Sequence, residues 1–427
     1  MAAATAWTLI VAGEHGNLLT RATILDHSAE DPLFPFAGFV DQRQESPGRW
    51  AAAVEDGPLG YDLCLLRYQA GDGGFEGSTL AWTSDCVGAS NTAALDSAQH
   101  NTGAKSLKLH LATAGAGNRA SGYRDMTNVP AGMTGSLSVA LRGDGTIPVA
   151  FQVYLPQVGL WLQSDGSWGT EAYVWTRTTA SWNTPTTLAV TLPGYATTRR
   201  QHVTVRLIAI LEHATTAGDG WLDDVTFHPH WDFFSAHDHD LGPIDIELYE
   251  SDDASTWALV DTCDIEPRSF FWYSTTKRTK RYVRILVAGT NHEPAWFGEL
   301  WLAQALAVAE SPSINVGRAD ALPQIRSTPG HGLGTASVSA LADTPQRTLL
   351  FDWIWSTEAA WAEFLTDVME RSGYGQWPTV IVPHSDDPDV LMVHFPEELA
   401  QAWLRGVMRK TSSQLELIED SFTIWIP

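Results

Sequence analysis

The chain has 427 residues, of which 44% are hydrophobic and 10% aromatic, enough for about two to four domains with ordinary packed cores. Its formal net charge is -24, from 26 basic and 50 acidic residues. Such a surface repels phosphate backbones and anionic membranes, so general nucleic-acid binding and membrane attachment are disfavoured. The charge suits a component of a larger particle, or a protein whose partner carries basic patches.

The N-terminal segment, residues 1–16, is predicted to be an arm. It lacks the basic start and the long apolar core of a signal peptide. No apolar run approaches the roughly 18–20 residues of a membrane-spanning helix. The three cysteines, Cys64, Cys86 and Cys263, form no closely spaced pair, which argues against a disulfide scaffold and a structural zinc site. We therefore expect a protein that is made in the cytoplasm and either stays there or is assembled there into something larger.

Most of the chain is predicted to be β-strand. Short alternating runs are bounded by Gly, Pro, Asn, Asp and Ser, so that every second side chain can face a core. This density of strands and turns, without an intervening helical pattern, favours a mainly β fold of antiparallel sandwiches. The clearest predicted strands are Ser106–Leu111, Gly135–Leu141, Val149–Leu155 and His202–Ile210.

Two separated stretches resemble the halves of one discoidin-like, galactose-binding-like β-sandwich. In residues 17–68 the segments are Asp31–Asp41, Gly48–Trp50 and Tyr61–Leu66, in the order of that family's opening strands. The family's remaining strands resume in residues 230–303, with the segments His237–Gly242, Ile244–Trp257, Arg281–Ile285 and Phe297–Trp301. Within the second stretch, Asp-Asp-Ala-Ser stands where the family usually has an Asp-Gly turn. The resemblance implies a single sandwich split by an insert.

The insert, residues 71–229, resembles a carbohydrate-binding jelly roll of the family 4/9 type. Three landmarks carry the resemblance in the family's order, namely Gly73–Trp82, His100–Leu109 and Gly220–Phe227. The first and last strands of such a jelly roll lie side by side, so it can be inserted into a loop of another domain. The resemblance implies a second β-sandwich with a glycan-binding role.

Five aromatic residues within a stretch of the insert are candidates for glycan contact, because flat aromatic faces stack on sugar rings in this family. The alternative is that most of them fill the interior of the sandwich. Trp161 and Trp168 are favoured, because Gln163–Trp168 has the pattern of an exposed hairpin. The candidates are Trp161, Trp168, Tyr173, Trp175 and Trp182.

Glu76 and Asp224 are candidates for a structural calcium site. The resemblance implies a carboxylate pair on the opening and closing strands of the jelly roll, and calcium prefers hard oxygen ligands. The alternative is two surface acids beside a strand end. Strand alternation predicts that Asp223 points to the opposite face, so that only one of the two aspartates could serve.

The segment His228–Asp240 is rich in histidine and aspartate. In an extended segment His237 and His239 share a face and could bind zinc or nickel with Asp232. The alternative, which we favour, is that the segment forms the structural corner of the discoidin-like domain.

Residues 305–427 resemble the tail-hub-like α+β barrel of phage tail rings. The predicted order is strand, helix, strand, strand, helix, strand, with helices at Thr357–Arg371 and Pro396–Met408. The turn-rich segment 311–340 and the apolar end Phe422–Pro427 suit an assembly domain that contacts neighbours.

These features together predict a non-enzymatic structural protein of a phage tail tip or baseplate, found in the virion. Its expected partners are other tail proteins, copies of itself in a ring, and a bacterial surface polysaccharide. The sequence has no nucleophile elbow, phosphate-binding loop, zinc-protease motif or dinucleotide fingerprint, and no cofactor is expected beyond the possible calcium. The alternative is a free-standing glycan-binding protein, or an accessory protein of a polysaccharide-degrading system.

Overall fold

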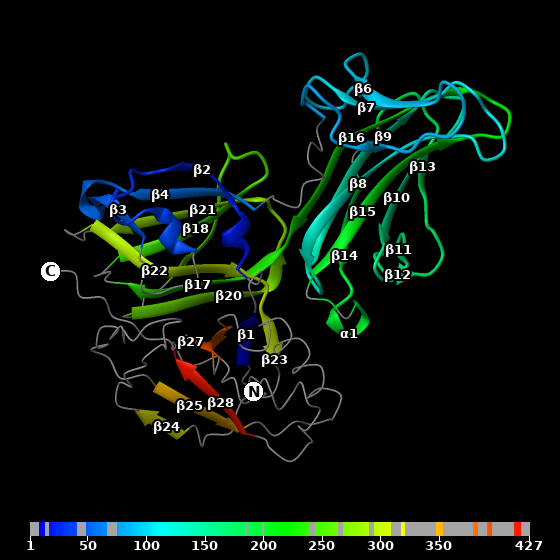
Figure 1. Cartoon of the computed structure of the whole chain (residues 1–427). Coiled ribbons are helices and arrows are strands. Elements are labelled where there is room, and N and C mark those ends of the chain that lie inside the picture. Colours follow the sequence, from blue (N-terminus) through cyan, green and yellow to red (C-terminus); the bar gives the residue numbers. More distant parts are fainter. Residues whose placement is uncertain are drawn as a thin grey trace, which may run out of the picture. The chain divides into compact units, whose positions relative to one another are not determined.

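The computed structural model describes most of the first 308 residues and five short strands beyond them. The described residues are 8–12, 17–40, 48–65, 75–183, 186–198, 200, 202–239, 244–263, 268–289, 294–308, 317–320, 347–352, 379–382, 391–394 and 414–419. Their regular structure is almost entirely antiparallel β-strand, which confirms the predicted mainly β fold with several sheets (Figure 1).

The chain folds into two compact units. The first combines residues 1–64 with residues 231–427, and the second comprises residues 65–230. The second unit therefore interrupts the first in sequence, and the predicted insert, 71–229, lies inside it.

The second unit is a sandwich of two sheets. One sheet has the order β12-β11-β10-β15-β8-β5, with β13 also paired to β10, and the other has the order β14-β9-β16-β7-β6. The strands of the first sheet are β5 (Thr83–Ser84), β8 (Arg119–Pro130), β10 (Val149–Leu155), β11 (Leu160–Leu162), β12 (Trp168–Gly169), β13 (Trp175–Arg177) and β15 (His202–Glu212). Those of the second are β6 (Thr92–Asp96), β7 (Ser106–Leu111), β9 (Thr134–Gly143), β14 (Thr186–Thr191) and β16 (Gly218–Pro229), and a short helix α1 (Tyr195–Thr198) precedes β15.

Strict alternation of side chains explains why these segments form a sandwich. In β15 the residues Val203, Val205 and Leu207 are buried, whereas the residues between them are partly exposed. The same pattern predicts the first and last residues of β7 and β10 correctly. Each sheet therefore has one face in the core and one face turned outward.

The first unit contains a sandwich of a four-stranded and a five-stranded sheet. Their orders are β20-β17-β22-β3 and β19-β18-β21-β4-β2. The four-stranded sheet consists of β3 (Gly48–Ala53), β17 (Trp231–His239), β20 (Arg268–Arg278) and β22 (Pro294–Ala303). The five-stranded sheet consists of β2 (Thr23–His27), β4 (Leu59–Cys64), β18 (Ile244–Ser251), β19 (Ala258–Cys263) and β21 (Tyr282–Gly289).

A cluster of aromatic rings joins these two sheets, and three short 3-10 helices lie beside them. The helices are η1 (Leu18–Arg21), η2 (Phe36–Phe39) and η3 (Val54–Asp56). Phe39 of η2 lies 5.0 Å from Trp50, 5.6 Å from Tyr61 and 5.8 Å from Phe297, measured between ring centroids. The rings come from both halves of the split sequence, so neither half can complete this core alone.

A seven-stranded sheet completes the first unit, in the order β23-β1-β26-β27-β28-β25-β24. Its strands are β1 (Thr8–Ala12), β23 (Leu306–Val308), β24 (Gly317–Asp320), β25 (Arg347–Asp352), β26 (Thr379–Val382), β27 (Leu391–His394) and β28 (Gln414–Glu419).

The N-terminal segment was predicted to be an arm, and the structure corrects this for residues 8–12. β1 pairs with β23 on one side and with β26 on the other. Val11 is 2% exposed and packs in one cluster with Phe233 and Trp301 of the sandwich and Val380 and Val382 of β26. A five-residue apolar strand is too short for sequence periodicity to identify, but two strand partners and a buried valine are enough to order it.

Several predictions fall outside the described residues. They are the helices Thr357–Arg371 and Pro396–Met408, the turn-rich segment 311–340 and the apolar end Phe422–Pro427. Within the described part of the chain, no helix is both long and apolar enough to cross a membrane.

Candidate functional site

One line of side chains crosses the outward face of the first sheet of the second unit. In the strand register Trp161 of β11 lies opposite Tyr154 of β10. Tyr154 lies opposite Arg206 of β15, and Arg206 lies opposite Asp125 of β8. Directly opposed residues of antiparallel strands project from the same face, so these four side chains form one row across four strands. We call Trp161, Tyr154, Arg206 and Asp125 the first row; at about 4.8 Å per strand it is about 14 Å long.

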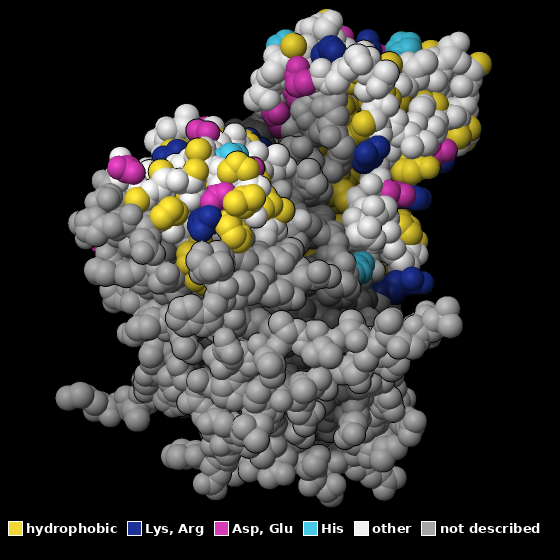
Figure 2. Space-filling view, turned by 60° about the vertical axis from the view of Figure 1, so that its left-hand side comes forward, with side chains coloured by type: hydrophobic (Ala, Val, Ile, Leu, Met, Phe, Trp, Pro, Cys, Tyr) yellow, Lys and Arg dark blue, Asp and Glu magenta, His cyan; other side chains and the backbone are white. Residues whose placement is uncertain are grey.

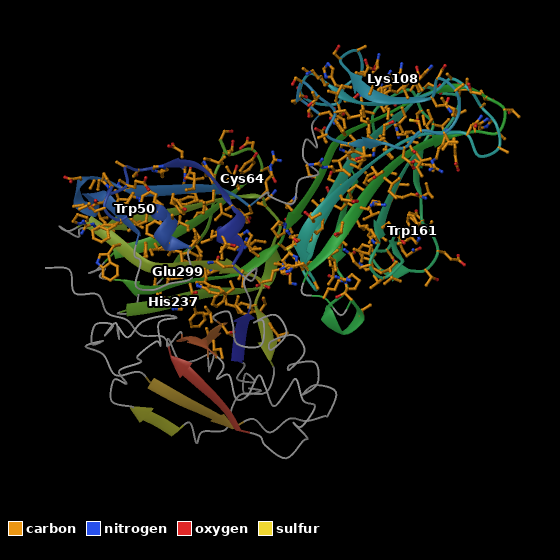
Figure 3. The ribbon with its side chains drawn as sticks, viewed as in Figure 1. Trp50, Cys64, Lys108, Trp161, His237 and Glu299 are labelled. Carbon is orange, nitrogen blue, oxygen red and sulfur yellow. The ribbon has the colours of Figure 1, made fainter. Side chains whose placement is uncertain are left out.

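The aromatic end of the first row is a tilted stack of two rings, which we call the platform. The rings of Tyr154 and Trp161 have centroids 4.3 Å apart and planes inclined by 30°. Both residues are partly exposed, whereas their neighbours Leu155 and Leu162 are fully buried. Figure 3 places Trp161 beside β10 to β12 and Lys108 on the other sheet of the same sandwich. The platform therefore lies on the outward side of the sheet.

The polar end of the first row is an ion pair with fixed geometry. Arg206 donates from Nε and from Nη2 to the two carboxylate oxygens of Asp125, at 2.7 and 2.8 Å. The guanidinium carbon of Arg206 also lies 4.4 Å from the ring centroid of Tyr123, two residues from Asp125 on β8. The hydrogen bonds with Asp125 raise the pKa of Arg206, so the guanidinium stays charged. Both side chains remain about one-third exposed.

This combination of groups suits a hydroxyl-rich ligand. An aromatic platform offers an apolar face to the C–H face of a sugar ring. The ion pair uses two of the five N–H donors of Arg206 and leaves lone pairs on Asp125, so both partners can still bond to hydroxyls.

The other predicted aromatic residues lie elsewhere in the same sandwich. Trp168 is opposite Leu162, and its indole N–H donates to the carbonyl of Thr191 in the other sheet, at 2.8 Å. Trp175 lies opposite the buried Phe151 and contacts it and Tyr173. The carbonyl of Trp182 accepts from the guanidinium of Arg177. The structure thus brings Trp161 alone of the five into the first row.

Sequence reasoning missed Tyr154, Tyr123, Arg206 and Asp125. Each occupies an outward position on a strand whose alternation is visible in the sequence. The missing information was the register between β8, β10 and β15, because these strands are far apart in the chain and only their pairing aligns the side chains.

Glu76 and Asp224 are brought to one loop of the second unit. Both carboxylate oxygens of Glu76 accept from the backbone N–H of Ala104, at 2.9 and 3.0 Å. Asp224 accepts from the side chains of Asn101 (2.7 Å) and Thr102. Both acids therefore hold the loop 101–104. A calcium ion shared by Glu76 and Asp224 stays a prediction.

The structure corrects the prediction for Asp223. It does not face away from Asp224, because its carboxylate accepts from the backbone N–H groups of Asn101 and Thr102, at 2.6 and 3.2 Å. The register between β16 and β9 shifts between Asp223 and Thr226, and Asp224 has a φ of 50°. This bulge breaks the alternation, and both aspartates reach the same loop. Burial raises the pKa of Asp223 to about 6.

The histidine-rich segment forms strand and not a corner up to residue 239. His237 lies within β17, is 2% exposed, and its Nε2 is 3.0 Å from the hydroxyl of Ser235. It lies opposite Glu299 of β22, as Figure 3 shows. The carboxylate of Asp232 accepts from the backbone N–H of Ala305. Among the described residues no group of three or more potential ligands could hold a metal ion.

No protein-family model matches the chain, and no curated protein matches it. Solved structures with partial similarity include the enzymatically active domain of bacteriophage CBA120 tailspike protein 4, at 14% identity and a TM-score of 0.28. The match covers 38% of this chain and 21% of that chain. A family 11 carbohydrate-binding module from Clostridium thermocellum in complex with a β-1,3-1,4-mixed-linked tetrasaccharide is 12% identical, with a TM-score of 0.26. That match covers 36% of this chain and 92% of the module. The module TmCBM61 in complex with β-1,4-galactotriose is 15% identical, with a TM-score of 0.25, and the match covers 37% of this chain and 96% of the module. The chain spans about a fifth of the tailspike domain, and similarity at this level does not assign a function.

Proposed function

We propose that this chain is a non-enzymatic structural component of a phage tail tip or baseplate whose second unit binds a bacterial surface polysaccharide. The observation that carries the glycan part is the first row. Its platform and its ion pair place apolar contact and hydroxyl recognition in one line on an outward sheet face. A single face of this kind gives weak binding, in the micromolar to millimolar range.

The tail part of the proposal rests on the resemblance of residues 305–427 to tail-ring domains and on the net charge of -24. An acidic protein avoids adventitious contact with nucleic acid and anionic membranes during assembly in the host cytoplasm. In this proposal the C-terminal region docks onto other tail proteins or onto copies of itself in a ring. The protein would then reside in the virion.

A free-standing glycan-binding protein is the second candidate. The observation that favours it is that all four residues of the first row come from one compact unit, so recognition requires no neighbouring chain. The two candidates share the binding site and differ only in assembly.

The glycan part is tested by affinity electrophoresis of the full chain in gels that contain lipopolysaccharide O-chains or capsular polysaccharide from a panel of bacteria. Removing one stacking ring costs about 1 kcal/mol, so Trp161→Ala is expected to weaken binding roughly fivefold, whereas Trp161→Phe retains most of it. Val87→Ser, at a site 41% exposed and outside the row, is the control. If no polysaccharide retards the wild-type chain, the glycan role is wrong.

The tail part is tested by mass spectrometry of purified virions and by electron microscopy of the purified protein. We expect the chain in virions and rings or tail-tip particles in the images. A protein that stays monomeric at high concentration and is missing from virions would leave the free-standing candidate in its place.

A further inference from the structure

A second line of side chains on the first unit repeats the composition of the first row. On the five-stranded sheet Leu259 of β19 lies opposite Tyr249 of β18. Tyr249 lies opposite Arg284 of β21, and Arg284 lies opposite Asp62 of β4. We call these four residues the second row. In both rows the order across the sheet is apolar residue, tyrosine, arginine and aspartate.

The ion pair of the second row has the geometry of that in the first. Arg284 donates from Nε and Nη2 to the two carboxylate oxygens of Asp62, at 2.7 and 2.6 Å. Its guanidinium carbon lies 4.4 Å from the ring centroid of Trp257, the distance that also separates Arg206 from Tyr123. The hydrogen bonds with Asp62 raise the pKa of Arg284. The arginine is 32% exposed and can bond to a ligand.

The second row lies on the outward face of its sheet. Its strand neighbours Leu248, Val283 and Ile285 are fully buried, and alternation turns Tyr249 and Arg284 the other way. Leu259 is 54% exposed. Figure 2 shows hydrophobic side chains beside side chains of both charges on the described surface of this unit. The face thus offers apolar area, donors and acceptors together.

We propose that the second row is a further glycan-binding site, and that its ligand is a neutral polysaccharide. The inference rests on the function proposed for the first row, whose chemistry it repeats. Neutrality follows from the charges around the row, because the carboxylates of Glu247, Asp62 and Asp26 outnumber the guanidinium groups of Arg284 and of Arg281, which lies over the ring of Tyr282 on the same strand. Asp26 lies opposite Asp62, and Glu247 accepts from the hydroxyl of Tyr249 at 2.6 Å. An acidic polysaccharide would be repelled there.

The chain then carries two recognition faces, one on each of its two compact units. A long polymer that engages both binds more tightly than either face alone, because the second contact is made at a high effective concentration. A short oligosaccharide, which reaches one face at a time, gains nothing from the second. This difference separates a true second site from a distortion of the first.

The test uses the full chain, gels that contain either a neutral or an acidic O-polysaccharide, and variants of each row. The second-row variant combines Tyr249→Ala with Leu259→Ser, the first-row variant combines Trp161→Ala with Tyr154→Ala, and a third variant combines all four changes. Leu33→Ser, at a site 80% exposed in the same unit, is the matched control. If Tyr249→Ala lowers the melting temperature, Leu259→Ser alone is used as the second-row variant. We expect each row variant to weaken retardation at least tenfold, the combined variant to abolish it, and the control to behave as wild type.

The outcomes distinguish the two proposals. If the second-row variant matches the wild type while the first-row variant abolishes retardation, the second site is refuted and the proposed function stands. If only acidic polysaccharides are retained by the second row, the proposed ligand class is wrong. If the wild-type chain is not retarded in any gel, both proposals fail.

Discussion

At the scale of single residues, Asp223 combines complete burial with a carboxylate that holds the loop 101–102. Burial raises its pKa from 3.8 to about 6 in the folded protein. The folded state therefore binds a proton more tightly than the unfolded state, and stability falls as pH rises from about 4 to about 6.

The corresponding prediction concerns Asp223→Asn, which keeps an acceptor and removes the titration. The shift corresponds to about 3 kcal/mol of pH-dependent stability, which the wild type loses between pH 4 and pH 7 and the variant does not. Thermal unfolding of both proteins at pH 4 and pH 7 measures the difference. A gap between their melting temperatures that is independent of pH would show that the carboxyl group does not have a raised pKa.

Gly103 is the residue that allows Glu76 to reach the loop. It has a φ of 63°, and a Cβ atom there would lie 2.1 Å from the nearer carboxylate oxygen of Glu76. Gly103→Ala is expected to cost about 1–2 kcal/mol for the left-handed backbone alone, and more because Glu76 must move. Gly117→Ala is the control, since Gly117 also has a positive φ but nothing within 4 Å of its Cβ position. Denaturant unfolding should show the larger loss for Gly103→Ala; equal losses would show that the contact with Glu76 contributes nothing.

At the scale of elements, β1 links the N-terminus to the C-terminal sheet. Val11→Ala removes a buried side chain between Phe233, Trp301 and Val380 and is expected to cost about 2 kcal/mol. Val87→Ala, at a partly exposed site, should cost less than about 0.5 kcal/mol. The free energies of unfolding in denaturant compare the two, and similar values would mean that β1 does not stabilise the unit.

Strand positions were more predictable than strand partners. Alternation identified β7, β10 and β15 because each covers a core with every second residue, a local property of the sequence. Neither row could be found this way. Asp62 and Arg284 are separated by 222 positions and Asp125 and Arg206 by 81, so their proximity depends on sheet register alone. The same limit applies to Asp223, where a bulge reverses the side that alternation predicts.

Aromatic clustering in sequence was a poor guide to the site for a physical reason. Trp161, Trp168 and Trp175 are close in the chain because β11, β12 and β13 are short strands at one side of a sheet. Side chains on neighbouring short strands fall on both faces. Trp161 therefore joins the outward row, whereas Trp168 bonds to the other sheet and Trp175 packs beside a core residue.

At the scale of the whole molecule, the chain consists of one unit interrupted by another. The interrupted unit has its own cores, formed by residues on both sides of the break. Phe39 and Trp50 precede it, and Phe297 and Trp301 follow it. The inserted unit has a separate core, with Leu107, Phe151 and Leu207 fully buried.

The final prediction is that replacing residues 71–229 by a short Gly/Ser linker leaves the first unit folded. The ends of the inserted unit are held close by one loop, because Glu76 near its start and Asp224 near its end both bond to residues 101–104. Removing the insert should therefore not pull β4 and β17 apart, and a short flexible linker costs little loop-closure free energy. We expect the shortened chain to unfold cooperatively in calorimetry, and to protect β21 and β22 from hydrogen exchange as in the full chain. A broad, non-cooperative transition would mean that the first unit needs the insert to fold, and that the two units are not independent.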